Sequence, residues 1–240
     1  MNIILFSPSE VELPLPGNDS RARHILQVLR RKIGDTFDAG LLNGPRGRAK
    51  IREIGKDGSL SLQFAWGESP PPLAPIRLIV GLPRPQTARD VLREGAALGV
   101  GAMDFVQTAR GEPSYASSSL WSSREWESQL VAGAAQAFCT RLPVVTCKLT
   151  LDAATALTAD TDTRLALDNY EASQPLSQAR LGAGTAAVIA IGSERGWTDP
   201  ERELLRQRGF SFVHLGPRVL RIETACIAAI SLLRAKLQLS

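Results

Sequence analysis

Hydrophobic and polar positions follow two different rhythms along the chain, and the change comes near residue 70. Residues 60–66 (LSLQFAW) alternate apolar with polar or small side chains, which is the period of a strand with one buried face. Residues 2–6 predict another short strand, and the segments 43–47 and 55–58 carry the glycine, proline, asparagine and aspartate typical of turns. The chain up to residue 68 therefore predicts a small, mostly β unit.

One helix is expected within this β unit. Apolar side chains recur at helical spacing between residues 25 and 33, with Asp19 or Ser20 as the N-cap and Gly34 as the end. The polar face of this helix is basic and carries Arg21, Arg23, Arg30, Arg31 and Lys32. Such a face is either solvated or a patch that contacts phosphates, and the sequence leaves both interpretations open.

A proline-rich segment separates the two rhythms. Residues 68–75 (ESPPPLAP) cannot continue a central strand, and three consecutive prolines favour an extended spacer. We therefore expect one domain over residues 1–72 and a second over residues 73–240.

The second part alternates between strand and helix patterns. Strands are expected at 76–82, 102–108, 142–147, 164–168, 185–192 and 210–216. Helices are expected at 87–100, 122–140, 151–157, 198–209 and 223–238. The first helix should turn Val91, Leu92 and Leu98 inward, and the fourth begins with a capping box of Thr198 and Glu201. This alternation predicts an α/β domain with a mostly parallel sheet.

Composition narrows the class of protein. Hydrophobic residues make up 44% of 240 residues, enough for a sizeable core, and the net charge of +4 is compatible with a polyanionic partner. Arginines gather in local clusters, and their forked guanidinium groups suit phosphates and planar oxygen groups. No apolar run approaches the roughly 20 residues of a membrane span, and the first residues do not resemble a signal peptide. We expect a cytoplasmic protein without a membrane partner.

Cysteine and histidine usage argues against metal chemistry. The three cysteines, Cys139, Cys147 and Cys226, lack the spacing of metal ligands and are expected to be reduced, buried thiols. Only two histidines exist, His24 and His214, so a zinc site or a Ser-His-Asp triad has little to build on. No metal is expected.

Unusual residues gather at the ends of three expected strands. These segments are 166–171 (ALDNYE), 190–197 (AIGSERGW) and 215–225 (LGPRVLRIETA). Ligands bind beyond the carboxyl ends of strands in open α/β sheets, and glycines in the second and third segments allow a close approach of backbone to ligand. GSERG is neither a Walker loop nor a dinucleotide fingerprint, which disfavours a nucleotide hydrolase.

The last two segments also carry a family resemblance. IGSERGWTDPE (191–201) followed by GFSFVHLGPRVLRIETACIAAI (209–230) resembles the C-terminal signature of the ribosomal RNA uridine N3-methyltransferases of the SPOUT superfamily. Upstream, RHILQVLRRKIGD (23–35), GLPRPQTARDVLREGAALGV (81–100) and AAQAFCTRLPVV (134–145) resemble further family segments in the same order. The resemblance covers nearly the whole chain, and the last motif is its most specific part.

This resemblance implies a fold, an activity and partners. The N-terminal domain would be a PUA-like β-barrel that binds RNA, and the C-terminal α/β domain would contain a trefoil knot, a rare exception to unknotted topology. The protein would act as a homodimer, with S-adenosylmethionine (SAM) held by the knot loops near the dimer interface. Its substrate would be a uridine of small-subunit (16S) ribosomal RNA (rRNA), methylated at N3.

The resemblance also assigns a cofactor site. The residues expected to hold SAM are Leu167, Ile191, Gly192, Glu194, Gly196, Leu215, Leu220, Arg221 and Thr224. Adenine requires an apolar slot with backbone donors and acceptors, and Ile191, Leu215 and Leu220 have suitable side chains for its walls.

Two residues are candidates for the chemistry. Arg221 would anchor the base or a phosphate, and Glu223 would orient that arginine or accept a proton. An acid in the first turn of a helix is favoured anyway, so capping is the alternative role for Glu223. Arginines expected to face RNA are Arg23, Arg30, Arg31, Arg84, Arg110, Arg195 and Arg218. A solvated surface side chain is the alternative for Arg218.

The chain departs from the family pattern at several positions. Arg195 replaces a glycine, which is costly if the position needs a positive φ, unless its side chain has adapted to reach the SAM carboxylate or an RNA phosphate. Other changes place Ala109 before Arg110, Ala135 before Gln136, and Cys139 where the family has arginine, with Arg141 as a possible substitute. These changes keep two alternatives open: a methyltransferase for another RNA site and a non-catalytic RNA-binding or assembly protein. An unrelated small-molecule enzyme on an α/β sheet is a third alternative.

Overall fold

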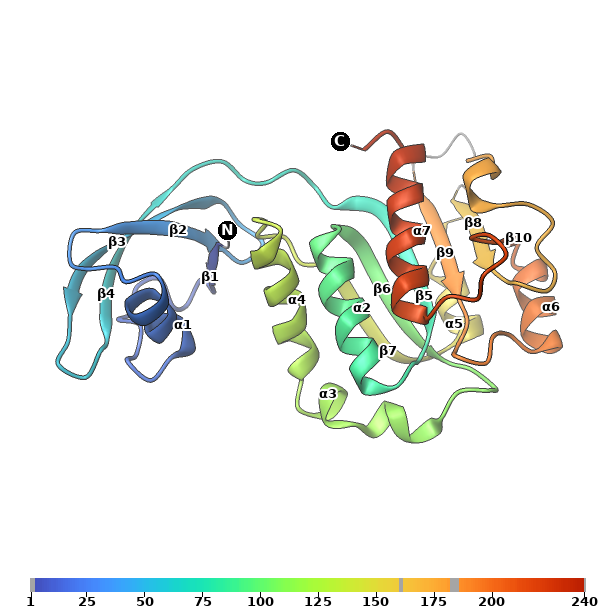
Figure 1. Ribbon diagram of the computed structural model, residues 1–240, viewed down its shortest axis with the longest axis horizontal. Coiled ribbons are helices and arrows are strands. Elements are labelled where there is room, and N and C mark those ends of the chain that lie inside the picture. The colour runs from blue at the N-terminus through green and yellow to red at the C-terminus, as the bar shows by residue number, and fades with distance from the viewer. Residues whose placement is uncertain (1–2, 160–161, 182–185, 240) are drawn as a thin grey trace. The chain divides into compact units, whose positions relative to one another are not determined.

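The computed structural model describes residues 3–159, 162–181 and 186–239, and its contacts divide the chain into two compact units (Figure 1). Unit 1 comprises Met1–Pro72 and Ala134–Leu142, and unit 2 comprises Leu73–Gly133 and Pro143–Ser240. Residues 134–142, which the sequence pattern placed in the second domain, therefore pack with the first. Backbone hydrogen bonds attach them, because Ile3 N–H donates to Ala135 and Asn43 N–H donates to Thr140.

Unit 1 is built around a four-stranded sheet in the order β1-β2-β3-β4, in which β1 is parallel to β2 and the other pairs are antiparallel. Its elements are β1 (Ile4–Phe6), α1 (Ser20–Arg23), a π-helical turn η1 (His24–Val28), β2 (Thr36–Leu41), β3 (Arg46–Ile54) and β4 (Leu60–Trp66). Alternation governs the burial: Ala49 and Ile51 of β3 are buried, whereas Arg48 and Lys50 between and beside them are exposed. The period of two predicted β4, and the segment 2–6 predicted β1, whereas β2 and β3 were expected only as part of a mostly β unit.

The helix predicted over residues 19–34 is mostly wrong. Asp19 caps its start as expected, accepting the Arg21 N–H at 2.7 Å, but α1 gives way at once to the π-helical turn. Arg30 then adopts a positive φ of 53°, which ends the helix. The wider turn of a π-helix breaks the 3.6-residue period, and Val28 at its end is 65% exposed. Ile33 lies beyond the helical residues and is 62% exposed.

Arg21 fits neither of the two interpretations that the sequence left open for the basic face, a solvated side chain or a phosphate contact. Its guanidinium contacts the Glu10 carboxylate at 2.5 Å and the Asp19 carboxylate at 2.7 Å, and it lies 5.1 Å from the centre of the Phe6 ring. The hydrogen bond from Arg21 is the main cause that lowers the pKa of Glu10 to about 2. This cluster fixes the segment before α1 against the sheet.

Acid is expected to weaken unit 1 through this cluster. The pKa of Glu10 falls from 4.5 to about 2 on folding, so its stabilisation is complete above pH 4.5 and is lost as the pH falls through about 2. The Glu10 side chain is 37% exposed, so solvent screening limits the effect to about 1 kcal/mol. Urea unfolding at several pH values should show this extra loss in the wild type and not in Glu10→Gln. Parallel pH profiles would contradict the assignment.

Unit 2 is an α/β domain with an entirely parallel described sheet in the order β10-β8-β9-β5-β6-β7. The strands are β5 (Ala74–Gly81), β6 (Val100–Gln107), β7 (Val144–Thr150), β8 (Thr163–Leu167), β9 (Ala187–Ile191) and β10 (Ser211–Val213). The helices are α2 (Pro85–Ala97), α3 (Ser119–Ser122), α4 (Glu125–Gln136), α5 (Leu151–Ala156), α6 (Asp199–Gln207) and α7 (Ile222–Lys236), with 3-10 turns η2 (Pro113–Ser117) and η3 (Leu176–Gln178). This architecture confirms the α/β prediction.

Helices cover both faces of this sheet (Figure 1). On one face α7 packs against β5, β9 and α2, and α2 packs against β6. On the other face Leu151 and Ala154 of α5 and Leu205 of α6 join a core cluster with Ile79 and Val188 of the strands. Burial on both faces explains why the strands are nearly continuous apolar runs rather than alternating ones.

Two predictions for unit 2 need correction, and one is confirmed. β5 already starts at Ala74, within the proline-rich segment, and Pro75 is accommodated because the register with β6 shifts between Ala74 and Arg77. The single long helix expected over residues 122–140 is instead α3 and the shorter α4, separated by Arg124 with a φ of 59°. The capping box of Thr198 and Glu201 is confirmed at the start of α6.

The described cysteines are only partly buried. Cys226 is buried, but Cys139 and Cys147 are half-buried, which corrects the expectation of three buried thiols. Burial raises the pKa of Cys147 to about 11, so this thiol is protonated at neutral pH. Among the residues that the structure describes, no helix has the length and apolar character to cross a membrane.

Candidate cofactor-binding site

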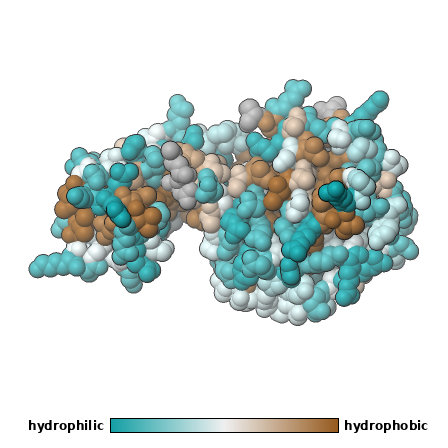
Figure 2. Space-filling view, viewed as in Figure 1, coloured by the Kyte–Doolittle hydropathy of each residue, from teal (hydrophilic) through white to brown (hydrophobic). Residues whose placement is uncertain are grey.

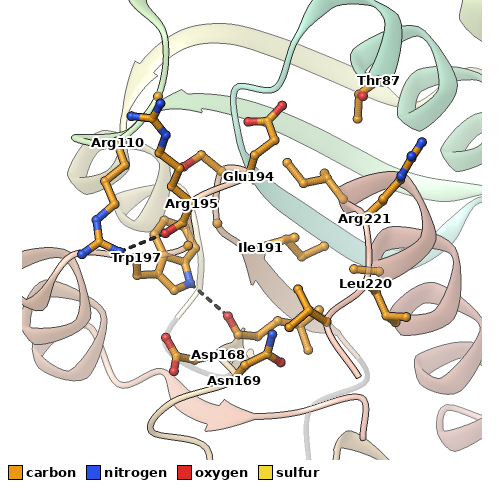
Figure 3. A pocket seen from close by; sticks show the side chains of 18 of the residues that line it. Thr87, Arg110, Asp168, Asn169, Ile191, Glu194, Arg195, Trp197, Leu220 and Arg221 are labelled. Atoms are coloured by element: carbon orange, nitrogen blue, oxygen red, sulfur yellow. Dashed lines mark hydrogen bonds between the residues drawn. The ribbon is translucent and has the colours of Figure 1, made fainter. Parts of the chain in front are cut away.

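A cavity of about 800 Å³ opens at the carboxyl edge of the unit 2 sheet. The loops after β5, β6, β8, β9 and β10 surround it, because parallel strands all end at this edge. Figure 3 shows the side chains of Ile191, Glu194 and Arg221 around this cavity. The predicted site residues that line it are Arg84, Arg110, Leu167, Ile191, Gly192, Glu194, Arg195, Gly196, Leu215, Arg218, Leu220, Arg221 and Glu223.

Four predicted site residues lie elsewhere. Thr224 follows Glu223 on α7 but is exposed and is not part of the cavity wall. Arg23, Arg30 and Arg31 belong to unit 1. The structure therefore gathers the three motif segments at one cavity of unit 2, whereas the N-terminal basic residues belong to the other unit.

The loop after β9 forms a tight turn over residues 193–196. Gly196 N–H donates to the Ser193 carbonyl at 2.8 Å, and Gly196 has the positive φ, 69°. Arg195 does not have a positive φ, so its side chain replaces the family glycine without the backbone strain that was expected.

Two arginines from other loops hold this turn. The Arg110 guanidinium donates to the Arg195 carbonyl at 2.9 Å, drawn as a dashed line in Figure 3. The backbone N–H of Arg84 donates to the Glu194 carboxylate at 3.1 Å. The turn is thereby tied to the ends of β5 and β6.

Close backbone packing fixes the base of the same loop. A Cβ atom on Gly81, at the end of β5, would lie 2.5 Å from the Ser193 nitrogen and 2.9 Å from the Gly192 carbonyl carbon. A Cβ atom on Gly192 would lie 3.1 Å from Gly196. Glycine at position 81 is therefore required for the two loops to approach each other.

Trp197 connects the loops after β8 and β9. Its ring is fully buried, and its indole N–H donates to the Leu167 carbonyl at 3.1 Å (Figure 3). Ile191, which is 4% exposed, and the half-buried Leu167, Leu215 and Leu220 give this side of the cavity an apolar wall. A flat heterocycle finds an apolar slot here with backbone groups at its rim.

A buried ion pair holds the loop after β8. Asp168 accepts hydrogen bonds from the backbone N–H groups of Tyr170 and Glu171 at 2.7 and 2.8 Å. Its other carboxylate oxygen accepts from the Arg202 guanidinium at 2.8 Å, and both side chains are almost fully buried. Burial works against the charge on Arg202, but the hydrogen bond with Asp168 and neighbouring carboxylates raise its pKa.

The third loop leads into α7. Arg221 is the exposed N-cap residue, and among the described residues no hydrogen bond or ion pair engages its side chain. Glu223 lies in the first turn, half-buried, where a carboxylate is stabilised by the helix dipole. The geometry is compatible with both the capping role and the chemical role of Glu223.

Sequence reasoning missed about as many cavity residues as it found. These are Thr87, Gly111, Glu112, Tyr115, Asp168, Asn169, Tyr170, Ser193, Trp197, Val219, Ile222 and Ala225. The segment 166–171 was recognised, but nothing in it distinguished the cavity-facing side chains from the others. The turn over 113–117 that carries Tyr115 gave no sequence signal at all. Among the described residues, no cluster of histidine, cysteine or acidic side chains is suited to hold a metal ion.

Comparison with known proteins assigns this architecture to a family. A model of the RNA methyltransferase domain matches residues 69–234. The chain belongs to this RNA methyltransferase family. This family membership confirms the resemblance found in the sequence.

Relatives of this methyltransferase match over nearly its whole length. The ribosomal RNA small subunit methyltransferase E of Treponema pallidum is 36% identical over 98% of this chain and 91% of its own. The ribosomal RNA small subunit methyltransferase E 1 of Borreliella burgdorferi is 29% identical over 99% of both chains. The solved structure of a ribosomal RNA small subunit methyltransferase E from Neisseria gonorrhoeae, bound to S-adenosyl methionine, is 26% identical, covers 97% of both chains and has a TM-score of 0.78.

Proposed function

We propose that this methyltransferase transfers a methyl group from SAM to N3 of a uridine in small-subunit rRNA. The observation that carries the proposal is the single cavity at which the three motif segments meet. The names of the relatives support rRNA as the substrate, and the SAM-bound Neisseria gonorrhoeae enzyme supports the cofactor.

The cavity fits SAM in size and chemistry. Its volume is within the range of small-molecule sites, and the apolar wall around Ile191, Leu215 and Leu220 suits adenine. Backbone of Leu167, Gly192 and Gly196 borders this wall, while Glu194 provides a charge for the amino acid part. SAM, when bound, supplies an electrophilic methyl group, so the protein has to position the acceptor nitrogen and exclude water.

Arg221 and Glu223 are proposed to act on the base. Removal of the N3 proton leaves negative charge on the uracil oxygens, and the unengaged guanidinium of Arg221 at the start of α7 is available to stabilise it. The positive end of the α7 helix dipole also stabilises this negative charge. Glu223, two residues on, would orient Arg221 or accept the proton.

A trefoil knot in unit 2 is part of the proposal. The connection between β8 and β9 contacts the chain on both sides of the last cavity loop: Leu176 N–H donates to His214, and Lys236 donates to Ser177. These contacts with the residue after β10 and with the end of α7 support the proposal that the C-terminal segment is threaded.

A PUA-like β-barrel over residues 1–72 is the corresponding proposal for unit 1. Pairing between Leu15 and Leu60 adds a segment beside β4, which supports closure of the sheet. A ribosomal RNA substrate supports the proposed location in the cytoplasm. The proposed chemistry requires no metal.

The proposed dimer interface is the outer face of α7. Figure 2 shows hydrophobic residues around this helix, and its exposed positions are small or apolar without charge: Thr224, Ile227, Ser231 and Ala235. A helix face of this kind favours close packing against a second copy. Sedimentation equilibrium is expected to give twice the chain mass of 25.9 kDa, and the mass of a single chain would contradict the dimer.

The structure weakens part of the argument for a non-catalytic RNA-binding protein. Ala135 and Cys139 lie in unit 1 and not at the cavity. Ala109 contributes its backbone N–H to the Glu201 carboxylate at 2.8 Å, a contact that any side chain except proline preserves. Arg195 is accommodated without positive φ.

The N-terminal basic residues are proposed to contact RNA phosphates. Reversing charge with Arg30→Glu and Arg31→Glu should weaken rRNA binding about tenfold and flatten its salt dependence, because two cationic contacts are lost. Filter binding at several salt concentrations measures both effects. Arg124→Glu, an exposed arginine of unit 2, is the control. Affinity equal to the wild type would leave Arg30 and Arg31 as a solvated face.

Calorimetric titration with SAM tests the cofactor site first. One binding event per chain is expected, and Leu220→Asp should abolish it because a carboxylate would enter the apolar wall. Absence of heat in the wild type, with and without small-subunit rRNA present, would contradict the proposal. Binding only in the presence of rRNA would indicate that RNA completes the site.

A further inference from the structure

Tyr170 has an unusual position for a large aromatic side chain. It belongs to the wall of the cofactor cavity, yet it is 82% exposed. Ile191 in the same wall is 4% exposed. Tyr170 therefore lies at the open side of the cavity, away from the sheltered apolar slot in which we place adenine.

The ring of Tyr170 is nevertheless held in place. The Arg202 guanidinium lies 5.5 Å from the ring centre, within the range of a cation–π contact. Arg202 itself cannot move freely, because it is buried and donates to Asp168 and Asp199, each at 2.8 Å.

The backbone beneath the ring is fixed as well. Asp168 accepts the backbone N–H groups of Tyr170 and Glu171, and Arg206, one turn after Arg202 on α6, pairs with Glu171. The loop that carries Tyr170 is therefore attached to α6 at three residues, Asp168, Tyr170 and Glu171. A side chain that is exposed but already ordered loses little conformational entropy when a ligand stacks on it.

We propose that Tyr170 is a stacking platform for an unpaired RNA base at the mouth of the cavity. One face of the ring contacts Arg202, which leaves the other face for the base. Stacking on an aromatic ring is how proteins hold bases outside a duplex, and an acceptor nitrogen can reach the cofactor only if its base leaves the stack. This inference rests on the proposed function and adds a substrate-binding residue to it.

Three variants at one position test the proposal. Tyr170→Phe keeps the ring, whereas Tyr170→Leu and Tyr170→Ala remove it, and all three should fold because the side chain is exposed. Filter binding with transcribed small-subunit rRNA is expected to show about tenfold weaker affinity for the Leu and Ala variants and wild-type affinity for Phe. The slope of affinity against salt should stay unchanged, since stacking releases no counterions.

SAM affinity shows whether the base that stacks on Tyr170 is the adenine of SAM or a base of the RNA. Calorimetry should give the wild-type SAM affinity for all three variants. Loss of SAM affinity with unchanged rRNA affinity would place adenine on the ring and overturn the proposal. Equal rRNA affinity of Tyr170→Leu and wild type would also overturn it. If the wild type itself bound no rRNA, the proposed function would fail, and this inference with it.

Discussion

Replacing Gly81 with alanine is expected to weaken SAM binding about a hundredfold. The new methyl group would lie 2.5 Å from the Ser193 nitrogen and 2.9 Å from the Gly192 carbonyl carbon, closer than any real contact. Both neighbours are backbone, so no side chain can rotate away. The loop after β9 must move instead, and with it the Glu194 and Gly196 positions proposed to hold the cofactor.

Gly95→Ala is the matched control for this variant. A Cβ atom on Gly95 in α2 would also be too close to its neighbour, at 2.6 Å, but that neighbour is the Met103 sulfur in a flexible side chain. Calorimetry should show near-wild-type SAM affinity for Gly95→Ala. Thermal unfolding of both proteins distinguishes a displaced loop from a general loss of folding. Equal SAM affinity of the two variants would show that the packing of the loop against β5 does not shape the site.

Arg221→Ala is expected to lower kcat about a hundredfold to a thousandfold while changing SAM affinity little. The guanidinium is proposed to stabilise charge that develops on the uracil only during the reaction, so its loss affects the transition state more than the bound cofactor. Radiolabelled methyl transfer to rRNA measures kcat, and calorimetry measures SAM affinity independently.

Two variants sharpen this test. Arg218→Ala removes an exposed arginine of the same cavity wall and should lower rRNA affinity without a comparable effect on kcat. Arg221→Lys keeps the charge but not the planar fork, so partial activity is expected. If Arg221→Ala lost SAM affinity and kept kcat at saturating SAM, Arg221 would be a cofactor ligand and not a group that acts on the base.

The parallel α/β sheet was predictable because its central strands are buried on both faces and because α6 begins with a strong capping box. Thr198 and Glu201 predicted from sequence alone where α6 begins, and the apolar runs predicted the strands. The segments at the strand ends were also recognisable, since parallel topology brings them to one edge.

The remaining features depend on contacts between distant residues. The π-helical turn after Arg23 and the positive φ of Arg30 are not visible in a 3.6-residue pattern. Residues 134–142 pack with unit 1 through backbone hydrogen bonds, which leave no trace in side-chain periodicity. Tyr170 was one of two tyrosines in the sequence until its contact with Arg202 distinguished it.

The most direct test of the methyltransferase assignment is identification of the modified nucleoside. Purified protein would be incubated with SAM and small-subunit rRNA, as free RNA and in assembled subunits, and the digested RNA analysed by mass spectrometry. With the wild type we predict 3-methyluridine at a single position. With Arg221→Ala we predict none after the same incubation time. A methyl group on another base or on ribose would contradict the N3-uridine assignment. No methylated nucleoside with either substrate, from protein that binds SAM, would contradict the catalytic role itself.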